Sequence, residues 1–574
     1  MVAADPSPTP TPTPPPVGPR WRPGGPRWRP GGRRPGGIVY EHPGAFWAGV
    51  GLVVVGTALQ LPPYLAASGR GHLLAGMGVD GPMATGMVLM VGGFALAVHG
   101  LLPRSWPAAA SPAASPVRIT ALDDAPLTGA HLGLVLVMAA AITIDVMKPT
   151  TLAFVAPGAA AEYGLRSATD PGAAGLPVAL YPLAGITGTV LGSFLWGGLA
   201  DRMGRRAAIL IAAVAFVATS TCGAMPSFEL NLLMCLLMGL GVGGMLPIIF
   251  SLVSETVPKR HRGWIIVLIG GDVAGAYVIM SWLASTIGTP ERFGWRILWL
   301  VGIPVSLLLV LLNRWIPESP RYLLQQGRDD EARAVMARYG AVAVEAEGGP
   351  EVVEAEIHHR YGQLFRPPFT ALTAVLVMLG LGIGIVQYGF HQWIPSNLQD
   401  LGLDEVAANR LLRDAALVGF PLNVPVALLY GFWSTRRTIA LMAALTAAAL
   451  VGFAVAGDSV VDHQGVLFVL LIPPIWGVSS LTAVTAAYAA EIYPTRVRGR
   501  GTGLTAAATK LGGVAILAAV AAALAAPSIS TTALIGSVPL VVALGLLLAF
   551  GVETTNKGLE EITREELAGA AGPA

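Results

Sequence analysis

Long apolar runs are the feature that most limits what this chain can fold into. Fourteen stretches approach the roughly 20 mostly apolar residues that a transmembrane helix needs. Two lie early, near Ala45–Ala66 and Met83–Pro103, and two sets of six follow on either side of a polar segment, Ile316–Pro368. Only 12% of the residues are charged, about half the share of a soluble domain. We therefore expect an all-α membrane protein with about 14 spans.

The spacing of the runs predicts how the chain is divided. The expected parts are a Pro/Arg-rich tail (1–43), a two-helix transmembrane hairpin (44–103), a linker (104–130), a six-helix bundle (131–316), a central loop (317–369), a second six-helix bundle (370–552) and a tail (553–574). The spans expected in the bundles lie near His131–Ala156, Pro177–Leu199, Ala207–Met225, Asn231–Leu252, Trp264–Ile287, Arg296–Trp315, Ala371–Trp393, Ala415–Trp433, Ile439–Ala456, Val466–Ala489, Gly503–Ala525 and Thr532–Phe550.

Basic residues gather in alternate loops. Of the 36 lysines and arginines, two lie inside spans, and 28 fall on one side of the membrane if the N-terminus is placed in the cytoplasm. The other side holds Arg70, Arg166, Arg292, Arg296, Arg410 and Arg413. Since basic loops stay inside, we expect a multi-pass protein of the cell membrane with both termini cytoplasmic.

The two six-span sets repeat each other in their cytoplasmic loops. The pattern E-x-x-P-x-x-x-R-G occurs at Glu255–Gly263 and again at Glu491–Gly499, 236 residues later. Corresponding positions at nearly the same offset carry Glu318 and Glu553, and Arg205-Arg206 and Arg436-Arg437. Two parallel repeats with a site between them near the midplane are a transporter plan.

Several motifs resemble those of the major facilitator superfamily. Gly197–Arg206 reads G-G-L-A-D-R-M-G-R-R and resembles its signature loop. Pro317–Leu324 is similar to the motif that closes the first half of sugar-porter-like members, and Glu553–Ile562 is similar to its C-terminal counterpart. The resemblance covers 131 to about 562 and implies the major facilitator fold, two six-helix bundles, here preceded by an extra hairpin.

Two segments narrow the branch. Asp145–Leu165 and Tyr388–Leu398 resemble the first and seventh spans of organic-acid carriers, including nicotinate, aromatic-acid and synaptic-vesicle-protein-like members. Sugar uptake and proton-antiport export remain open alternatives. The second-half signature loop, Gly431–Arg437, lacks the acidic residue, which leaves its contacts uncertain. The extra pair of spans precedes the core instead of separating the halves, which argues against the multidrug exporters.

The loop motifs supply candidate gating residues. Asp201 can cap a helix N-terminus, and neighbouring arginines can reach carboxylates such as Glu255. Our hypothesis is that these bonds hold the cytoplasmic side closed while the site faces outward; plain helix capping and positive-inside topology are the alternative. Glu255 with Arg262, Glu491 with Arg498, and Glu318 with Arg321 form analogous sets. The candidates are Asp201, Arg202, Arg205, Arg206, Glu255, Arg262, Glu318, Arg321, Arg436, Arg437, Glu491 and Arg498.

Charges inside the spans are the main candidates for the transport site, since each costs about 2.5–3.5 kcal/mol at mid-bilayer. Asp145 and Lys148 share a helical face, either as a coupled proton or anion site or as a mutually neutralising pair. Asp272 and Lys510 lie at one depth in repeat-related spans. We expect Lys510 to hold an anionic substrate and Asp272 or Asp145 to carry the coupling proton; a direct Asp272–Lys510 bridge is the rival.

Polar residues on two further spans complete the candidate site. They offer hydrogen bonds and an aromatic surface, although single polar residues in spans often only join helices. They are Gln387, Tyr388, His391, Gln392, Trp393 and Asn423.

We expect secondary transport of a small metabolite by alternating access and proton symport. An organic acid is the substrate that we favour. The sequence holds no H-E-x-x-H, P-loop or G-x-S-x-G motif, so neither an enzyme nor an ATP-driven pump is supported. A non-transporting receptor on the same scaffold is the third possibility. We expect no cofactor beyond a proton gradient, no metal, a small-molecule substrate and the lipid bilayer as partners, no nucleic acid, and a monomer.

Overall fold

The computed structural model places most of the chain. The described residues are 42–102, 117–118, 120–123, 125–166, 173–271, 273–289, 292–341, 344–345, 360–391, 394, 398, 401–403, 405–523 and 528–557. Within them the regular secondary structure is helical except for an isolated bridge between Arg166 and Pro177 and one two-residue strand pair, in which β1 (Val117–Arg118) lies antiparallel to β2 (Val344–Glu345). The expected all-α membrane fold is confirmed.

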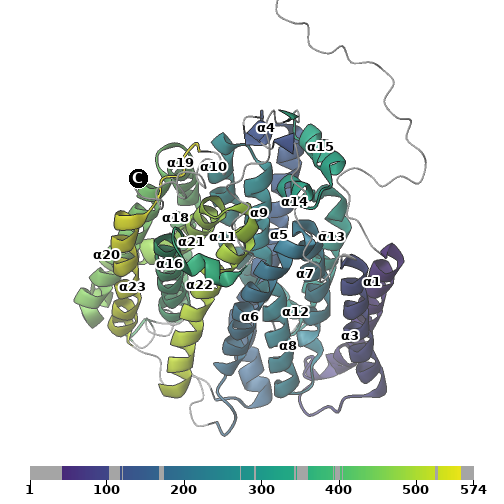
Figure 1. Ribbon diagram of the computed structural model, residues 1–574. Helices are drawn as coiled ribbons and strands as arrows, with labels where there is room; N and C mark the ends of the chain where they lie inside the picture. The colour runs from purple at the N-terminus through teal and green to yellow at the C-terminus, as the bar shows by residue number, and fades with distance from the viewer. Residues whose placement is uncertain are drawn as a thin grey trace, which may run out of the picture. The chain divides into compact units, whose positions relative to one another are not determined.

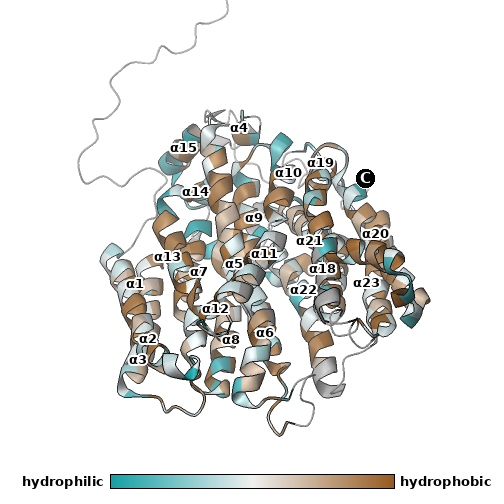
Figure 2. Cartoon of the chain, turned by 180° about the vertical axis from the view of Figure 1, so that it is seen from behind, coloured by the Kyte–Doolittle hydropathy of each residue, from teal (hydrophilic) through white to brown (hydrophobic). Residues whose placement is uncertain are grey.

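Thirteen helices in the described ranges are long and apolar enough to cross a membrane. The remaining expected span, near Trp264–Ile287, is present as two helices, α10 (Lys259–Gly270) and α11 (Val273–Thr286), on either side of residue 272. Apolar residues cover the helices and polar ones gather at their ends and on α15, as the colours of Figure 2 show.

The N-terminal hairpin is joined by glycines spaced seven residues apart. In α1 (Pro43–Ala58) these are Gly49 and Gly56, and in α3 (Gly81–Leu101) they are Gly86, Gly93 and Gly100. A spacing of seven keeps them on one helical face. A Cβ atom at Gly56 would lie 2.6 Å from the carbonyl oxygen of Gly86, so the two backbones touch. Both helices also pack on α7 (Arg205–Thr219) of the first bundle.

The first half follows a short linker helix, α4 (Thr120–Asp123). Besides α10 and α11, its helices are α5 (Gly129–Tyr163), α6 (Leu180–Met203), α7 (Arg205–Thr219), α8 (Phe228–Val242), α9 (Met245–Thr256), α12 (Ile297–Leu300) and α13 (Gly302–Leu311). The central loop carries α14 (Pro320–Gln325) and α15 (Asp329–Arg338). In Figure 1, α4, α14 and α15 gather at the end of the bundle where α10 and α19 also lie.

The second half repeats this plan with fewer breaks. Its helices are α16 (Thr370–Ile385), continued by a π-helical turn (Val386–Phe390), then α18 (Glu405–Gly419), α19 (Asn423–Phe432), α20 (Thr435–Ala456), α21 (Gln464–Ile492), α22 (Thr495–Ala523) and α23 (Ile529–Phe550). Short 3₁₀ turns and small helices (α2, Leu61–Ala66, among them) join the longer elements.

Packing between the halves involves a limited set of helices. α6 packs on α22, α9 packs on α21 and α22, and α10 packs on α19 and α21. By contrast, α11 packs on α5 and α18 packs on α21, each within its own half. Among the described elements, the extensive contacts between the halves therefore belong to the helices that lead to the loops with the repeated motifs, which are described next.

Candidate functional site

The predicted gating residues meet at one end of the bundle. We call this the signature-loop end and define it by residues 201–206, 255–263, 318–322, 434–437 and 491–500. Fourteen charged side chains are buried in the described part of the chain, and most of them lie here. A buried charge is tolerated only when it is paired or hydrogen-bonded, so this end must be a network of ion pairs.

Asp201 pairs with an arginine of the other half. Its carboxylate accepts a hydrogen bond of 2.8 Å from Arg500 on α22, and Arg205 of its own half lies 3.6 Å away. Both partners of the first pair have side chains at most 4% exposed. Glycines let the helices approach, since a Cβ atom at Gly503 would lie 2.7 Å from the carbonyl oxygen of Ser193. The first signature loop is thus fastened directly to α22.

The two repeated motifs exchange partners between the halves. Arg498 donates to Glu255 at 2.7 Å, and Arg262 lies 3.8 Å from Glu491. Each glutamate therefore meets the arginine of the other repeat, not the arginine of its own set. Glu255 also receives Arg205 of its own half at 3.2 Å. The exchange makes these four residues a closed contact between the halves.

The repeat-related glutamates Glu318 and Glu553 act within their own halves. Glu318 accepts hydrogen bonds from the backbone N–H groups of Arg205 (2.8 Å) and Arg206 (3.3 Å), which begin α7. Glu553 accepts from the backbone N–H of Thr435 (2.9 Å), which begins α20. Both carboxylates thus cap a helix N-terminus, where negative charge is favoured.

The surroundings of these two glutamates move their pKa values in opposite directions. Burial raises the pKa of Glu318, and this outweighs the backbone hydrogen bonds that it accepts. Burial acts in the same direction on Glu553, but hydrogen bonds from Ser434, Thr435 and Thr555 outweigh it and lower the pKa of Glu553 to about 2.

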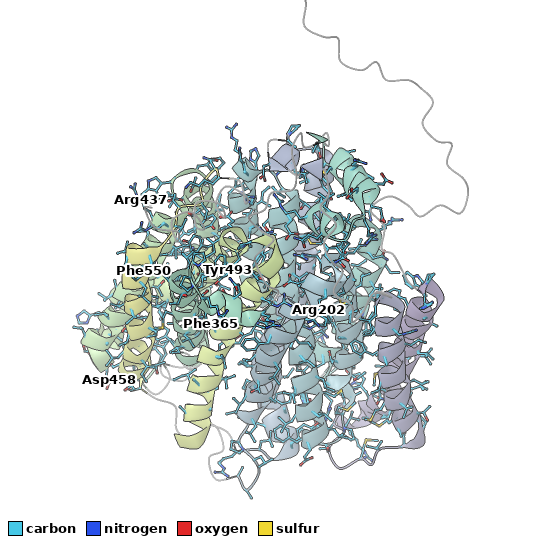
Figure 3. All side chains as sticks on the ribbon, in the orientation of Figure 1. Arg202, Phe365, Arg437, Asp458, Tyr493 and Phe550 are labelled. Carbon is cyan, nitrogen blue, oxygen red and sulfur yellow. The ribbon has the colours of Figure 1, made fainter. Side chains whose placement is uncertain are left out.

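The other predicted gating residues have local contacts. Arg206 donates to the side chain of Asn313 at 3.2 Å, and Arg321 donates to the carbonyl oxygen of Glu255 at 3.1 Å. Arg436 donates to the carbonyl oxygen of Leu548 in its own half. Arg202 and Arg437 are exposed, and Figure 3 shows them on different halves. Arg437 lies over the ring of Trp433.

A second contact between the halves lies deeper, at Lys510. This residue is ten positions beyond Arg500 on α22, which is about 15 Å along a helix. Its ammonium group donates to the hydroxyl of Ser193 on α6 (3.1 Å) and to the carbonyl oxygen of Gly243 (3.3 Å). Asp145 on α5 lies across the interface and interacts electrostatically with Lys510. The two charged groups are too far apart to form a salt bridge.

Asp145 and Lys148 have different surroundings although they are one turn apart. Asp145 is 2% exposed, and its Oδ1 atom has no hydrogen-bond partner among the described residues. Lys148 is 3% exposed and donates to the carbonyl oxygen of Phe216 (3.3 Å) and to the hydroxyl of Ser220. Lys148 thus lies against α7, within its own half, while Asp145 faces the charge of the second half.

The remaining predicted site residues are only partly described. Gln387, Tyr388 and His391 are half-buried. Asn423 is buried and accepts a hydrogen bond from Ser480 at 2.8 Å while donating to the carbonyl oxygen of Phe420. Three of the predicted residues, Asp272, Gln392 and Trp393, lie outside the described residues.

Comparisons with known proteins agree with this architecture. Residues 158–565 match the model of the "Sugar (and other) transporter" family. The chain belongs to this family. The niacin transporter NiaP of Acinetobacter baylyi is 26% identical over 77% of this chain and 99% of its own length. Synaptic vesicle glycoprotein 2A of Rattus norvegicus is 28% identical over 47% of this chain and 42% of its own length.

A solved structure shows the same fold. The proton:xylose symporter XylE of E. coli, a major facilitator superfamily protein, superposes with a TM-score of 0.63 at 16% identity, over 76% of this chain and 99% of its own. The predicted membership of the major facilitator superfamily, in its sugar-porter-like part, is therefore confirmed. So is the prediction that the chain is a membrane transporter and not an enzyme.

Three residues of the contacts described above did not emerge from the sequence. Arg500 follows the second repeat motif by one residue, and only the need of Asp201 for a cationic partner pointed to it. Ser193 stands in a glycine-rich span where nothing marks a hydroxyl as a lysine's acceptor. Asp123 belongs to the linker, outside every motif, yet it contacts Arg262 at 3.5 Å and Arg321 at 3.7 Å.

Proposed function

We propose that this family member is a proton-coupled secondary transporter that moves a small organic anion by alternating access between its two halves. The observation that carries the proposal is the contact of Lys510 with Ser193 and Gly243. A cation from one half, bonded to neutral oxygens of the other half deep in the interface, can exchange those oxygens for a substrate carboxylate.

The charge of Lys510 fits an anionic substrate better than a neutral one. In this state its ammonium group has only a hydroxyl and a carbonyl oxygen as acceptors among the described residues, and no carboxylate within 4.0 Å. A carboxylate would form a charge-assisted hydrogen bond, which is roughly twice as strong as a neutral one. The name of the Acinetobacter relative, a niacin transporter, supports a small carboxylate as substrate.

Asp145 is our candidate for the coupling proton. It is buried with an unpaired oxygen atom and lies in the field of Lys510. When Asp145 is ionised it offsets the charge of Lys510, and when a proton neutralises it, Lys510 is left to attract an anion. Proton and anion binding therefore support each other, which is the requirement for symport.

The closed signature-loop end gives the state that this structure represents. We place that end in the cytoplasm because the basic loops lie there, with both termini on the same side in the cell membrane. The exchanged pairs Glu255–Arg498 and Glu491–Arg262 then close the cytoplasmic side, and the site is reached from outside. A single chain, driven by the proton gradient alone, suffices for this cycle.

Sugar transport is the second candidate, because the family model is that of sugar and other transporters. Transport of a neutral sugar, unlike transport of an anion, requires no cationic side chain at the site. A sugar transporter would tolerate a neutral residue at position 510, and an anion transporter would not.

The test is uptake into proteoliposomes under an imposed pH gradient, with radiolabelled nicotinate, benzoate and xylose. We expect carboxylate uptake, a loss of at least tenfold in Lys510→Ala, and partial retention in Lys510→Arg. Arg333→Ala, which removes an exposed ion pair on α15, is the matched control and should leave uptake unchanged. Full carboxylate uptake by Lys510→Ala would overturn the proposal, and uptake of xylose alone would favour the second candidate.

A further inference from the structure

We propose that Asp123, contributed by the linker that precedes the six-helix core, is a positioning residue of the cytoplasmic gate; the inference rests on the alternating-access function proposed above. Asp123 acts through Arg262 and Arg321, which lie on opposite sides of its carboxylate. The linker is thereby a working part of the transporter and not only a tether for the extra hairpin.

The carboxylate of Asp123 bridges two buried arginines. Its Oδ1 atom lies 3.5 Å from Arg262 and its Oδ2 atom lies 3.7 Å from Arg321. Asp123 is 6% exposed, and the arginines are 1% and 2% exposed. The three charges are thus shielded from water. Electrostatic interactions between them are therefore stronger than they would be at the surface.

Arg262 is the residue through which Asp123 reaches the second half. The guanidinium group of Arg262 also lies 3.8 Å from Glu491 and donates to the carbonyl oxygen of Lys557 in the C-terminal segment. Linker, second repeat motif and C-terminal segment therefore meet on one side chain. A carboxylate on the linker side of this guanidinium fixes where its other edge points.

The charge balance of the closed end depends on Asp123. The described residues bury six arginines at this end, Arg205, Arg206, Arg262, Arg321, Arg498 and Arg500. The core supplies four buried carboxylates to them, Asp201, Glu255, Glu318 and Glu491. Asp123 is the fifth buried carboxylate, and it contacts both Arg262 and Arg321. Within the core, Arg262 has its carboxylate partner 3.8 Å away, and Arg321 donates to a backbone carbonyl oxygen. With Asp123 the buried positive charges at this end exceed the negative ones by one, and without it they would exceed them by two, which favours opening to water.

The linker is anchored well enough to hold this carboxylate in place. Leu122, next to Asp123, is 1% exposed and belongs to the main apolar core. Upstream, Val117 and Arg118 pair with Glu345 and Val344 of the central loop. Downstream, a Cβ atom at Gly340 would lie 3.2 Å from the side chain of Thr128. The segment is therefore held to the central loop on both sides of Asp123, and Figure 1 shows α4 beside α14 and α15.

The experiment compares Asp123→Asn with Asp123→Glu in the full chain. Asp330→Asn is the matched control, because the Asp330 side chain is fully exposed on α15 and pairs only with a half-exposed arginine. Spin labels are placed at two exposed positions, Gln326 after α14 and Arg437 at the start of α20. Double electron–electron resonance between them reports the distance across the signature-loop end. Initial uptake rates give KM and kcat.

We expect Asp123→Asn to add a population with a longer distance and to raise the KM for external substrate several-fold, since the outward state is depleted. Asp123→Glu should restore both, which a loss of folding stability alone would not explain. If Asp123→Asn yields too little protein, Asp123→Asn/Arg321→Gln removes one charge of each sign and should show the same longer distance.

An unchanged distance distribution and an unchanged KM in Asp123→Asn would overturn the inference. A parallel measurement on Asp201→Asn shows whether the role of Asp123 or the whole gate account has failed. If that variant lengthens the distance while Asp123→Asn does not, the gate account stands and only the role of Asp123 is wrong. If neither variant lengthens it, the proposed alternating-access closure fails as well.

Discussion

Beside the exchanged ion pairs, two contacts join the halves at the signature-loop end, and although the internal repeat relates them, they are built from different chemistry. In the first, the α6–α7 loop meets α22 through the buried pair Asp201–Arg500. In the second, α19 meets α10 through aromatic side chains: a Cβ atom at Gly431 would lie 2.7 Å from Trp264, and one at Gly263 would lie 3.0 Å from Tyr430. The second signature loop lacks the acidic residue. On its partner helix, α10, the position that corresponds to Arg500 carries an aromatic residue, Trp264.

The difference shows how one end of a transporter can combine reversibility with shape. Separating a buried ion pair is costly in apolar surroundings but costs far less when water reaches both charges as the halves part. Aromatic packing has no such compensation, because the exposed surface remains apolar. We infer that the first contact decides whether the end is open, while the second holds the register in which the halves close.

The largest effect is expected from breaking the charged contact. Asp201→Asn or Arg500→Gln leaves one buried charge unpaired, which costs about 3–5 kcal/mol. Uptake should fall by at least tenfold while the amount of protein in the membrane stays normal. A double-mutant cycle with both changes should show strong coupling, that is, a double variant little worse than either single one. Additive losses would show that the two residues act separately.

The sequence predicted this region in part. The repeated E-x-x-P-x-x-x-R-G pattern predicts Glu255, Arg262, Glu491 and Arg498 on one side, because repeat motifs mark equivalent positions, and the four side chains meet at one end of the structure. It did not reveal that the pairs are exchanged between halves, since a local spacing says nothing about which copy lies nearer. Glu318 and Arg321, expected as an analogous set, have separate partners: Glu318 caps α7 within its own half, and Arg321 contacts Asp123 and the carbonyl oxygen of Glu255.

The transport site was harder to predict than the fold. The apolar runs gave the helices because span length is a local property, although several spans are present as two shorter helices, such as α8 and α9 or α12 and α13. Helical spacing put Asp145 and Lys148 on one face, but it could not show that Lys148 turns to Ser220 while Asp145 faces Lys510. The outcome depends on which neighbouring helices offer acceptors, and that is a tertiary property.

A smaller effect is expected from the aromatic contact. Trp264→Ala removes a half-buried ring, which costs less than the about 3–5 kcal/mol of a fully buried aromatic. Uptake should fall only a few-fold. Raising the salt concentration should change this variant no more than the wild type, because the ring that is removed carries no charge. A loss as large as that of Asp201→Asn would erase the distinction between the two contacts.

The smallest effect separates the two capping glutamates. Because the pKa of Glu553 is lowered to about 2, its contribution to stability is present above its ordinary pKa and is lost as the pH falls towards 2. The pKa of Glu318 is raised, so its ionisation weakens the fold as the pH rises through that value. Glu553→Gln should therefore lower Tm by a few degrees at pH 7, and the loss should shrink on acidification.

Glu318→Gln provides the comparison. It should change Tm less than Glu553→Gln at pH 7, because the buried charge that it removes is poorly tolerated. Thermal unfolding in detergent from about pH 8 down to about pH 2, which spans the range in which the Glu553 contribution is lost, measures both variants. Equal losses at every pH would show that the two caps are equivalent.

The central claim is that the site beside Lys510 is closed from the signature-loop end and open from the other end, and one accessibility measurement tests it directly. Val514→Cys places a thiol one turn beyond Lys510, in a chain whose two cysteines, both buried, are replaced by alanine. Membrane-impermeant maleimide is then added to sealed vesicles of either orientation. We predict labelling only from the side opposite the signature loops, and labelling from both sides once Asp201 is changed to Asn. Labelling from the signature-loop side in the unaltered gate would contradict the account.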